Sequence, residues 1–253
     1  MPIDVLDDLY RLFDGELVGR LGTQVDLGGD QAKFGIDAIF PAILGGLMKK
    51  ASTPQGADSL GKMLSQDDFN GRLLEKLPGM FDADTAPGDI SMLSSLGWPV
   101  LESLFGDSIA SVAGVLSKHT GIGPDKSTSL MAILAPLVLS YLGSKKRTND
   151  LDSDGVARLL VAQKDTVASN LPPGMAETLG LRDLGIADPG DADLRIPASS
   201  RHASVSSGGG MVWWLPVLVV VALTAWFMLP SGRTNLNKSV DEVVTDAETK
   251  SSK

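Results

Sequence analysis

The chain has 253 residues and a formal net charge of −9, and 43% of its residues are hydrophobic while only 5% are aromatic. The absence of cysteine excludes disulfide bonds, thiolate metal sites and cysteine nucleophiles. An acidic chain without a basic stripe also lacks the charge that supplies most nucleic-acid affinity, so we expect no DNA or RNA partner.

The first predicted element is an amphipathic helix close to the N-terminus. Apolar side chains recur every three or four residues and define one stripe, which comprises Leu6, Leu9, Phe13, Leu17 and Leu21. The residues before this stripe are acidic and contain no long apolar run, so we expect no secretory signal there.

The second predicted helix covers residues 32–50 and is apolar around most of its circumference. It should therefore be buried, and Pro41 should kink it because proline lacks the N–H group that a helix uses. Before this helix, Gly28 is predicted to adopt the left-handed conformation, and Asp30 to accept from the first free N–H groups. A third, shorter helix is expected to start near Gly56.

An internal repeat organises this part of the chain. A shift of 95 residues aligns residues 3–47 with residues 98–142 without a gap, and ten of these 45 positions are identical. We predict two copies of one helical unit, over residues 3–65 and 98–165. The identical pairs are Val5/Val100, Leu6/Leu101, Leu9/Leu104, Gly19/Gly114, Leu21/Leu116, Gly28/Gly123, Asp30/Asp125, Pro41/Pro136, Leu44/Leu139 and Leu47/Leu142.

Between the copies, residues 66–97 are predicted to form one further helix and then an acidic surface loop over residues 82–89. The apolar side chains of that helix are Leu73, Leu74 and Leu77. The second copy repeats the buried central helix over residues 127–145, with Pro136 inside it. A last short helix is expected near residues 175–179.

The C-terminal part of the chain has a different composition. Residues 186–210 are rich in Asp, Pro, Ser and Gly, which is typical of a flexible linker. Residues 211–229 are all apolar except Thr224, and as a helix they would span roughly 28 Å, close to the thickness of a bilayer core. We predict a transmembrane helix here, with membrane-interface side chains at its two ends: Trp213, Trp214, Trp226 and Phe227.

The sequence therefore predicts an all-α protein. Residues 1–185 form one helical domain built from the duplicated unit, and the transmembrane helix is followed by a short polar tail over residues 230–253. Because a large leaderless domain precedes the single span, we expect a single-pass protein of the bacterial inner (cytoplasmic) membrane with its N-terminal domain in the cytoplasm.

Several motifs resemble one bacterial family. They are Phe40-Pro-Ala-Ile-Leu-Gly-Gly-Leu-Met, Ala51-Ser-Thr-Pro-Gln-Gly-Ala-Asp-Ser-Leu, Leu104-Phe-Gly, Thr120-Gly-Ile, Ala135-Pro-Leu and Leu171-Pro-Pro-Gly. Over residues 5–180 the chain is similar to the DUF937 family, which includes the YidB-like proteins. This resemblance implies a helical fold and implies no particular activity.

One motif resembles a calcium site. Asp150-Leu-Asp-Ser-Asp-Gly matches the opening of an EF-hand loop, but Val161 stands where that loop needs a glutamate. The position before the third helix of the second copy favours a simpler role, in which Asp152 or Ser153 is the N-cap of that helix. We therefore predict no metal site.

Two further motifs suggest chemistry and have simpler explanations. Gly121-Ile-Gly-Pro-Asp-Lys-Ser-Thr resembles a phosphate loop, but no strand precedes it and Pro124 removes an amide donor. Ser108 lies in a hydrolase-like Gly-Asp-Ser-Ile block, yet no Asp-x-x-His partner exists for it. His119 is interpreted as a polar helix-end residue, where the helix dipole favours a cation.

We expect a membrane-anchored, non-enzymatic interaction or scaffold protein, with no catalytic, cofactor or metal site. Its expected partners are the lipid bilayer and either another protein or a second copy of itself. The alternative is a binder of lipid or another apolar small ligand, which a cavity around Phe40 and Leu139 would favour and a filled core would disfavour. A hydrolase is the least favoured class.

Overall fold

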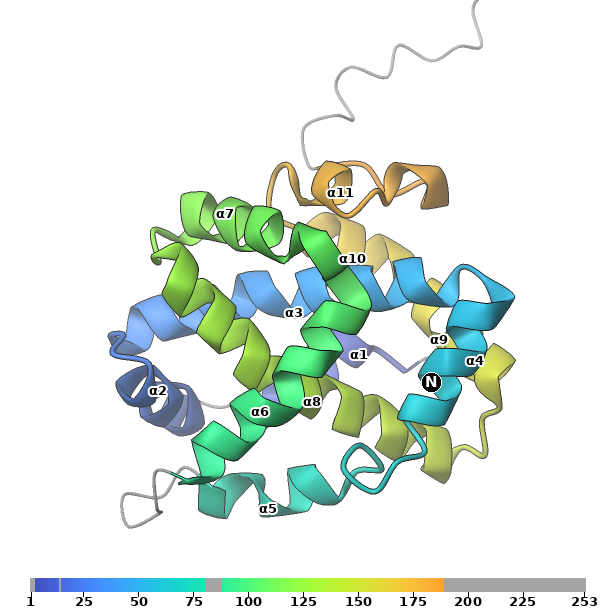
Figure 1. Cartoon of the computed structure of the whole chain (residues 1–253), viewed down its shortest axis with the longest axis horizontal. Coiled ribbons are helices and arrows are strands. Elements are labelled where there is room, and N and C mark those ends of the chain that lie inside the picture. The colour runs from blue at the N-terminus through green and yellow to red at the C-terminus, as the bar shows by residue number, and fades with distance from the viewer. Residues whose placement is uncertain (1–2, 14, 81–87, 189–253) are drawn as a thin grey trace, which may run out of the picture. The chain divides into compact units, whose positions relative to one another are not determined.

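The computed structural model describes residues 3–13, 15–80 and 88–188. Within these ranges the chain forms eleven α-helices and two 3₁₀ turns and contains no β-strand, which confirms the predicted all-α fold (Figure 1). In chain order they are α1 Val5–Leu12, α2 Gly15–Gln24, α3 Gly29–Ala51, α4 Pro54–Met63, α5 Arg72–Met80, α6 Gly88–Phe105, η1 Gly106–Ser108, α7 Ile109–Thr120, α8 Pro124–Thr148, α9 Ser153–Val161, α10 Lys164–Asn170, α11 Met175–Thr178 and η2 Arg182–Leu184.

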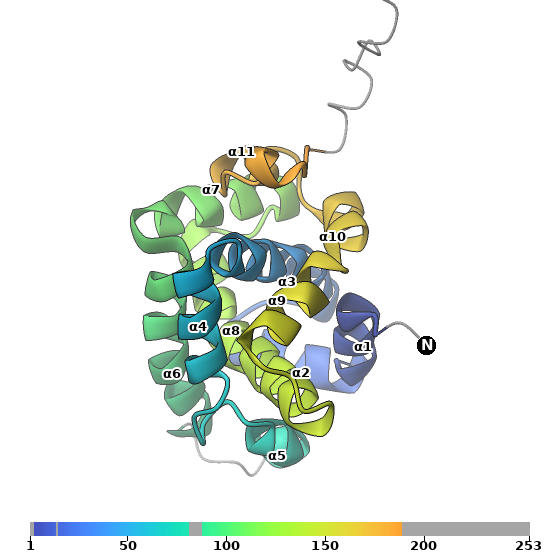
Figure 2. The same cartoon turned by 90° about the vertical axis from the view of Figure 1, so that its right-hand side faces the viewer.

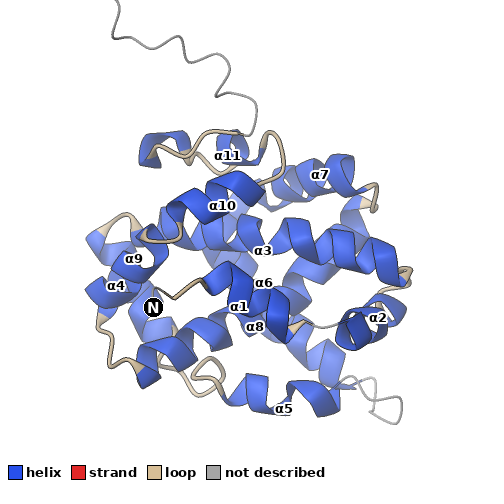
Figure 3. Ribbon diagram, turned by 180° about the vertical axis from the view of Figure 1, so that it is seen from behind, coloured by secondary structure: helices blue, strands red, loops and turns tan. Residues whose placement is uncertain are grey.

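Two long helices, α3 and α8, contact each other at the centre of the domain (Figure 2). They are apolar on every side, and beyond their first turns almost all of their side chains are buried. Such helices need neighbours all around, and α1 and α6 lie on opposite sides of the pair (Figures 1 and 3). This arrangement confirms the prediction that the second helix of each unit is buried.

Each central helix loses one hydrogen bond at an internal proline. Pro41 of α3 and Pro136 of α8 have no N–H group, so they cannot bond the carbonyl groups of Asp37 and Ala132, four residues earlier. A buried carbonyl without a partner is costly. In α3 the hydroxyl of Tyr10 takes the place of the missing donor, with its Oη atom 3.0 Å from the Asp37 carbonyl oxygen.

The predicted first helix is wrong as a single element, because α1 ends at Leu12 and α2 begins at Gly15. Phe13 leaves the helical conformation, with φ −101° and ψ 76°. This break lets the Phe13 ring turn inward onto Phe40, while α2 packs along α3. The stripe is nevertheless buried as predicted, apart from Leu17, which is half-buried.

The turn before α3 also differs from the prediction. Gly28 and Gly123 are not left-handed, since they are extended N-cap residues of α3 and α8. The left-handed residues come two positions earlier, at Asp26 and Gly121, where the preceding helices end and their last carbonyl groups need donors. Asp30 lies within the first turn of α3 and does not cap it.

A buried glutamine fixes the start of α1. The Oε1 atom of Gln163 accepts from the Val5 N–H group at 2.9 Å, and its Nε2 atom donates to the Ile3 carbonyl at 2.7 Å. The hydroxyl of Tyr141, in α8, donates to the carboxylate of Asp8. The N-terminal helix is therefore held by residues that lie more than a hundred positions further along the chain.

The segment between the predicted copies contains α5, as expected from its leucines, and Leu73 and Leu77 are buried. Residues 82–87 of the predicted loop lie outside the described residues. Its last two residues, Gly88 and Asp89, belong to helix α6 instead of the loop. At the other end, Ile186 is fully buried although the prediction places it in the linker. The folded domain therefore continues at least to Asp188.

Candidate functional site

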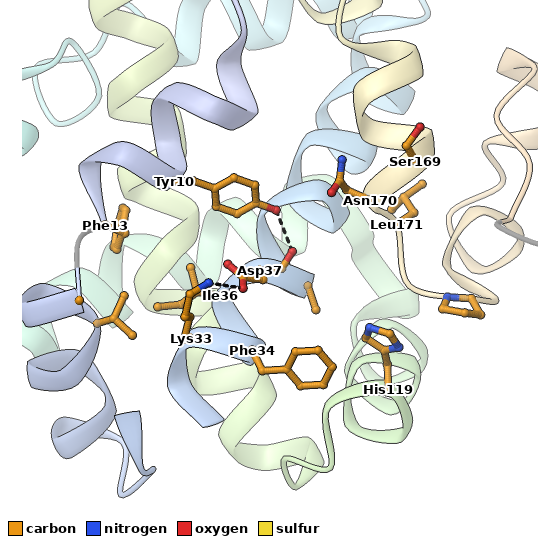
Figure 4. Close-up of a pocket in the computed structure, with 14 residues that line it drawn as sticks. Tyr10, Phe13, Lys33, Phe34, Ile36, Asp37, His119, Ser169, Asn170 and Leu171 are labelled. Atoms are coloured by element: carbon orange, nitrogen blue, oxygen red, sulfur yellow. Dashed lines mark hydrogen bonds and ion pairs between the residues drawn. The ribbon is translucent and has the colours of Figure 1, made fainter. Parts of the chain in front are cut away.

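A pocket of about 700 Å³ lies beside the first half of α3 (Figure 4). Its walls come from α1, the start of α2, α3, the end of α7, the end of α10 and the segment that follows it. We call it the aromatic pocket, and its defining residues are Tyr10, Phe13, Phe34, Asp37, His119 and Leu171. Helices that are distant in sequence thus meet around one hollow.

The inner wall of the aromatic pocket is a fixed cluster of rings. The centroid of the Phe40 ring lies 5.1 Å from that of Phe13 and 5.8 Å from that of Tyr10. The Phe13 ring meets Phe40 edge-on, which is a favourable geometry for aromatic rings. Because Phe40 is fully buried, it holds the two pocket rings in place from below.

The hydroxyl group of Tyr10 is committed to the backbone. It donates to the carbonyl oxygen of Asp37, which Pro41 leaves without a helical partner. Burial of the phenol, and then the nearby Asp37 carboxylate, raise the pKa of Tyr10 above its ordinary value. Tyr10 is therefore a neutral structural donor at working pH rather than an acid or base.

One ion pair lies at the pocket edge. The Nζ atom of Lys33 is 2.6 Å from Oδ2 of Asp37, one helical turn further along α3. The Lys33 side chain is 66% exposed, so this pair contributes little to stability. It does place a carboxylate and an ammonium group beside the aromatic wall.

The outer rim of the pocket exposes a large apolar side chain. Phe34 is 46% exposed and lies in the first turns of α3, before the part of this helix that is buried. The ring of His119 lies against it, with centroids 5.3 Å apart and planes inclined by 31°. His119 occupies the last turn of α7, so the predicted helix-end position is confirmed. The structure adds that its ring lies beside that of Phe34 at the pocket (Figure 4).

The aromatic pocket could not be predicted from the sequence because its residues come from five separate helices. The one local signal is Phe34 itself, a large apolar residue that stands next to Lys33 in the polar first turns of α3. A phenylalanine at a position that the helical period turns toward solvent favours a contact surface.

The calcium-like motif is a helix cap. Asp152 is the N-cap of α9, and its Oδ1 atom accepts from the Gly155 N–H group at 2.6 Å. This was the simpler of the two predictions. Among residues 3–13, 15–80 and 88–188, no three His, Asp or Glu side chains come together with the spacing of a metal site.

The phosphate-like motif is the turn between α7 and α8. Gly121 ends α7, and Pro124 begins α8. The Nζ atom of Lys126 lies 2.8 Å from Oδ2 of Asp26, in the corresponding turn before α3. This lysine therefore joins two turns of the domain.

The hydrolase-like residues do not meet. Ser108 ends η1 just before α7, and His119 lies in the last turn of the same helix. Eleven residues of helix separate them by about 16 Å, which is far beyond hydrogen-bond reach. Ser108 is half-buried and caps nothing with its side chain.

A cavity around Phe40 and Leu139 would have favoured the apolar-ligand alternative. Both side chains are fully buried, and neither lines the aromatic pocket. The two central helices contact each other, and the ring of Phe40 packs against those of Tyr10 and Phe13. The hollow lies on the outer side of Phe40, beyond the rings of Tyr10 and Phe13.

The predicted membrane-interface residues Trp213, Trp214, Trp226 and Phe227 lie outside the described residues, as does the whole of the predicted span. In the part of the chain that the structure describes, two stretches have the length and hydropathy to cross a membrane, at Ser91–Thr120 and Pro124–Thr148. The second is 83% buried within the domain, so packing accounts for its hydropathy. The first is interrupted by η1.

Comparison with known proteins identifies one family. The profile described as "Bacterial protein of unknown function (DUF937)" matches residues 7–145, which cover more than half of the chain and include all of α2 to α7. No curated protein and no solved structure matches the chain. The match agrees with the motifs quoted above, and the chain therefore belongs to the DUF937 family of bacterial proteins.

Proposed function

We propose that this protein is a non-enzymatic interaction module that is anchored in the bacterial inner membrane and binds an apolar segment of a protein partner in the aromatic pocket. The observation that supports this function is the exposure of Phe34 at the rim of a pocket whose inner rings are fixed. Exposed aromatic side chains beside a preformed hollow are typical of the residues that dominate protein interfaces.

The chemistry of the pocket fits a peptide-like partner. Apolar rings form its wall, and one carboxylate and one ammonium group lie at its edge. Such a surface can bury an apolar side chain while it pairs a neighbouring charge or main-chain group. Tyr10 is already bonded to the backbone, so its ring contributes shape rather than reactivity.

The anchor is the predicted helix over residues 211–229, with the membrane-interface residues Trp213, Trp214, Trp226 and Phe227. The domain lies on the cytoplasmic side in this proposal, and the polar tail lies across the membrane. Protease added to intact spheroplasts should then remove a C-terminal tag and leave the N-terminal domain whole. Digestion of the domain would show the opposite orientation.

The proposal includes the internal duplication, which three pairs of helices support. The helices α7, α8 and α9 start 94, 95 and 99 residues after α2, α3 and α4. Both central helices contain a proline at the same place, and both turns before them hold a left-handed residue. The two copies then differ in function, because the aromatic pocket lies beside α3.

Lipid or another apolar small ligand is the second candidate, and the size of the pocket favours it. A volume of about 700 Å³ lies within the range of small-molecule sites. A bound lipid would place its chain against the rings and its headgroup near Lys33. A hydrolase remains the least favoured class, since Ser108 and His119 are far apart.

The test is affinity capture of the full-length chain from solubilised membranes, with two matched variants. Phe34→Ala removes the exposed ring of the pocket, and Trp98→Ala removes a ring of similar exposure, 49%, from α6. A partner that binds the pocket should be lost at least tenfold from Phe34→Ala and retained by Trp98→Ala. Retention by both variants would contradict the proposed site.

Native mass spectrometry of the same purified chains separates the two candidates. An added mass of lipid size that disappears in Phe34→Ala would support the apolar-ligand function and contradict a protein partner as the occupant. Chains without added mass, together with Phe34-dependent capture, would support the interaction module.

A further inference from the structure

The helix α6 carries an apolar stripe on its exposed face. The side chains of Met92 and Trp98 are 48% and 49% exposed, and Ser95, midway between them, is exposed as well. Residues three positions apart lie on the same side of a helix. The opposite side of α6 packs on α8, with Gly97 against its backbone (Figures 1 and 2). We call the residues Met92, Ser95 and Trp98 the α6 stripe.

The charge of α6 sets this helix apart from the rest of an acidic chain. No charged residue occurs between Asp89 and Glu102. The uncharged residues of the central helices, 38–48 and 127–144, are mostly buried, so packing accounts for their composition. The hydropathic stretch that begins with α6 is only 33% buried. Because two copies of a chain with a net charge of −9 repel each other, an uncharged stripe is a surface where they can meet without like-charge contacts.

An internal proline gives the α6 stripe a backbone acceptor. Pro99 has no N–H group, so it cannot donate to the carbonyl of Ser95, four residues earlier. In α8 the corresponding carbonyl lies against α6, whereas Ser95 lies on an exposed face. The Ser95 hydroxyl donates to the carbonyl of Ser91 at 2.8 Å, and rotation about its Cα–Cβ bond can redirect it to an acceptor on another molecule.

The α6 stripe is self-complementary about Ser95. Met92 and Trp98 lie three residues before and after this serine, which is about 4.5 Å along the helix and about 60° around it on either side. In an antiparallel pair of α6 helices with a twofold axis at Ser95, Met92 of each copy is level with Trp98 of the other. The small serine allows a close approach, and the methionine sulfur is a favourable neighbour for an aromatic ring.

We propose that two copies of this chain form a dimer in which their α6 helices pack antiparallel around Ser95. The Ser95 hydroxyl of each copy donates to the Ser95 carbonyl of the other, and each Met92 packs beside a Trp98 ring. This inference goes beyond the proposed function. It leaves both aromatic pockets open, because α6 and the pocket helix α1 lie on opposite sides of the central pair (Figures 1 and 3).

Cysteine trapping tests the contact, because the chain has no cysteine of its own. A stable complex buries about 1,200 Å² or more, and one helix per chain offers a smaller contact, so covalent capture suits this dimer. Ser95→Cys places one thiol at the twofold axis, and mild oxidation of native membranes should give a disulfide-linked dimer. The matched control is Ser129→Cys, since Ser129 is also an exposed helical serine whose hydroxyl bonds the carbonyl four residues earlier. We expect at least ten times more dimer from Ser95→Cys.

A second substitution tests the apolar contact. Trp98→Glu in the Ser95→Cys chain should lower the dimer yield at least fivefold, because it places like charges in the contact. Phe34→Ala in the same chain should leave the yield unchanged. Circular dichroism shows whether the Trp98→Glu chain keeps its helices, as expected for a side chain that is 49% exposed. A folded Trp98→Glu chain that still gives the full yield would contradict the interface.

Photo-crosslinking tests the direction of the two helices. With p-benzoyl-phenylalanine in place of Trp98, irradiation of native membranes should give an adduct of dimer mass whose second peptide contains Met92. A parallel pair would instead join position 98 to the residues around position 98 of the other copy, which would overturn the antiparallel arrangement.

The remaining outcomes separate this inference from the proposed function. Equal dimer yields from Ser95→Cys and Ser129→Cys would indicate random collisions and overturn the interface. An adduct of position 98 with another protein, or with lipid alone, would give the α6 stripe a different occupant and overturn it as well. None of these results bears on the aromatic pocket, whose partner is tested by Phe34→Ala. A dimer trapped at Ser95 without any Phe34-dependent capture would support the interface and contradict the proposed function.

Discussion

In each of the two central helices, an internal proline leaves one carbonyl group without a helical donor, and a different contact is made with each of these carbonyls. In α3, the Asp37 carbonyl accepts from the Tyr10 hydroxyl. In α8, a Cβ atom built on Gly97 of α6 would lie 1.7 Å from the Ala132 carbonyl oxygen, so the Cα–H group of this glycine stands against that oxygen. A side-chain donor keeps α1 at a distance from α3, whereas direct backbone contact brings α6 onto α8.

The residue before each proline also differs in size between the two helices. It is Phe40 in α3 and Ala135 in α8, and both are fully buried. The large ring of Phe40 supports the wall of the aromatic pocket. On α8, the close approach of α6 is between Gly97 and Ala132. The pocket therefore lies beside α3, against which large side chains pack. Beside α8, where the backbone of α6 packs directly, α6 leaves no such space.

The largest effect is expected at the ring beneath the pocket. Phe40→Ala should lower the free energy of unfolding by about 4 kcal/mol, because it opens a cavity under two rings that pack on it. Urea denaturation of the full-length chain in mild detergent measures this. The control is Phe34→Ala on the same helix, which should cost less than about 1 kcal/mol since this ring is 46% exposed. Equal costs would contradict the assigned roles.

The contact between α6 and α8 should be nearly as sensitive. Gly97→Ala should cost about 3 kcal/mol, because its methyl group would overlap backbone atoms of Ala132 that cannot move without the helix. Gly114→Ala in α7 is the matched control, since no atom lies within 4 Å of its Cβ position. That variant should be neutral or stabilise the domain by up to about 1 kcal/mol, because alanine favours helices. Thermal unfolding followed by circular dichroism compares the two.

Removal of the hydroxyl that covers α3 should have a smaller effect. Tyr10→Phe should cost about 1.5 kcal/mol, because the Asp37 carbonyl then lacks a donor in a partly buried site. In a Pro41→Ala background the helix regains its own N–H donor, so the same change should cost less. A double-mutant cycle by urea denaturation measures the coupling. Identical costs in both backgrounds would show that the hydroxyl does not replace the missing helical bond.

The smallest expected effect is the loss of the stabilisation by Asp8 at low pH. The hydrogen bond from Tyr141, together with the charge of Lys145 at 3.1 Å, holds the pKa of Asp8 below its ordinary value, against the opposing effect of burial. The resulting stabilisation is complete above the unfolded-state pKa of about 3.9 and is lost as the pH falls through the folded value. The difference in melting temperature between the natural chain and Asp8→Asn should therefore shrink from about pH 6 to about pH 2. A constant difference would contradict this role.

Periodicity predicted the two central helices, because a buried helix must place apolar residues wherever it meets neighbours. The run around Phe40 is apolar on all sides, and this alone indicated a central position. Local patterns could not predict that Phe13 leaves the helix, since the reason is a contact with a ring 27 positions later. They also misplaced the left-handed residue at Gly28, because Asp26 adopts that conformation despite its side chain.

The aromatic pocket was even less accessible to sequence analysis. Tyr10, Phe34, His119 and Leu171 belong to four segments, and each has an ordinary explanation as a core or helix-end residue. What joins them is the packing of α1, α7 and α10 around α3, which no local pattern encodes. The family match does not indicate the pocket either. It covers residues 7–145, where the shared motifs are helix-end and packing residues, and the pocket-lining segment after α10 lies outside it.

The attachment of α1 has a consequence for the order of folding. Its partners lie far along the chain: Val5 bonds a residue 158 positions away, and Asp8 bonds one 133 positions away. Contacts of such high sequence separation close large loops, so they form after the local helix pairs. During synthesis, α1 leaves the ribosome first and waits until Gln163 has emerged. The aromatic pocket, which needs α1 as a wall, is therefore completed in the last stage of folding, and a nascent chain that stops before residue 163 would lack it.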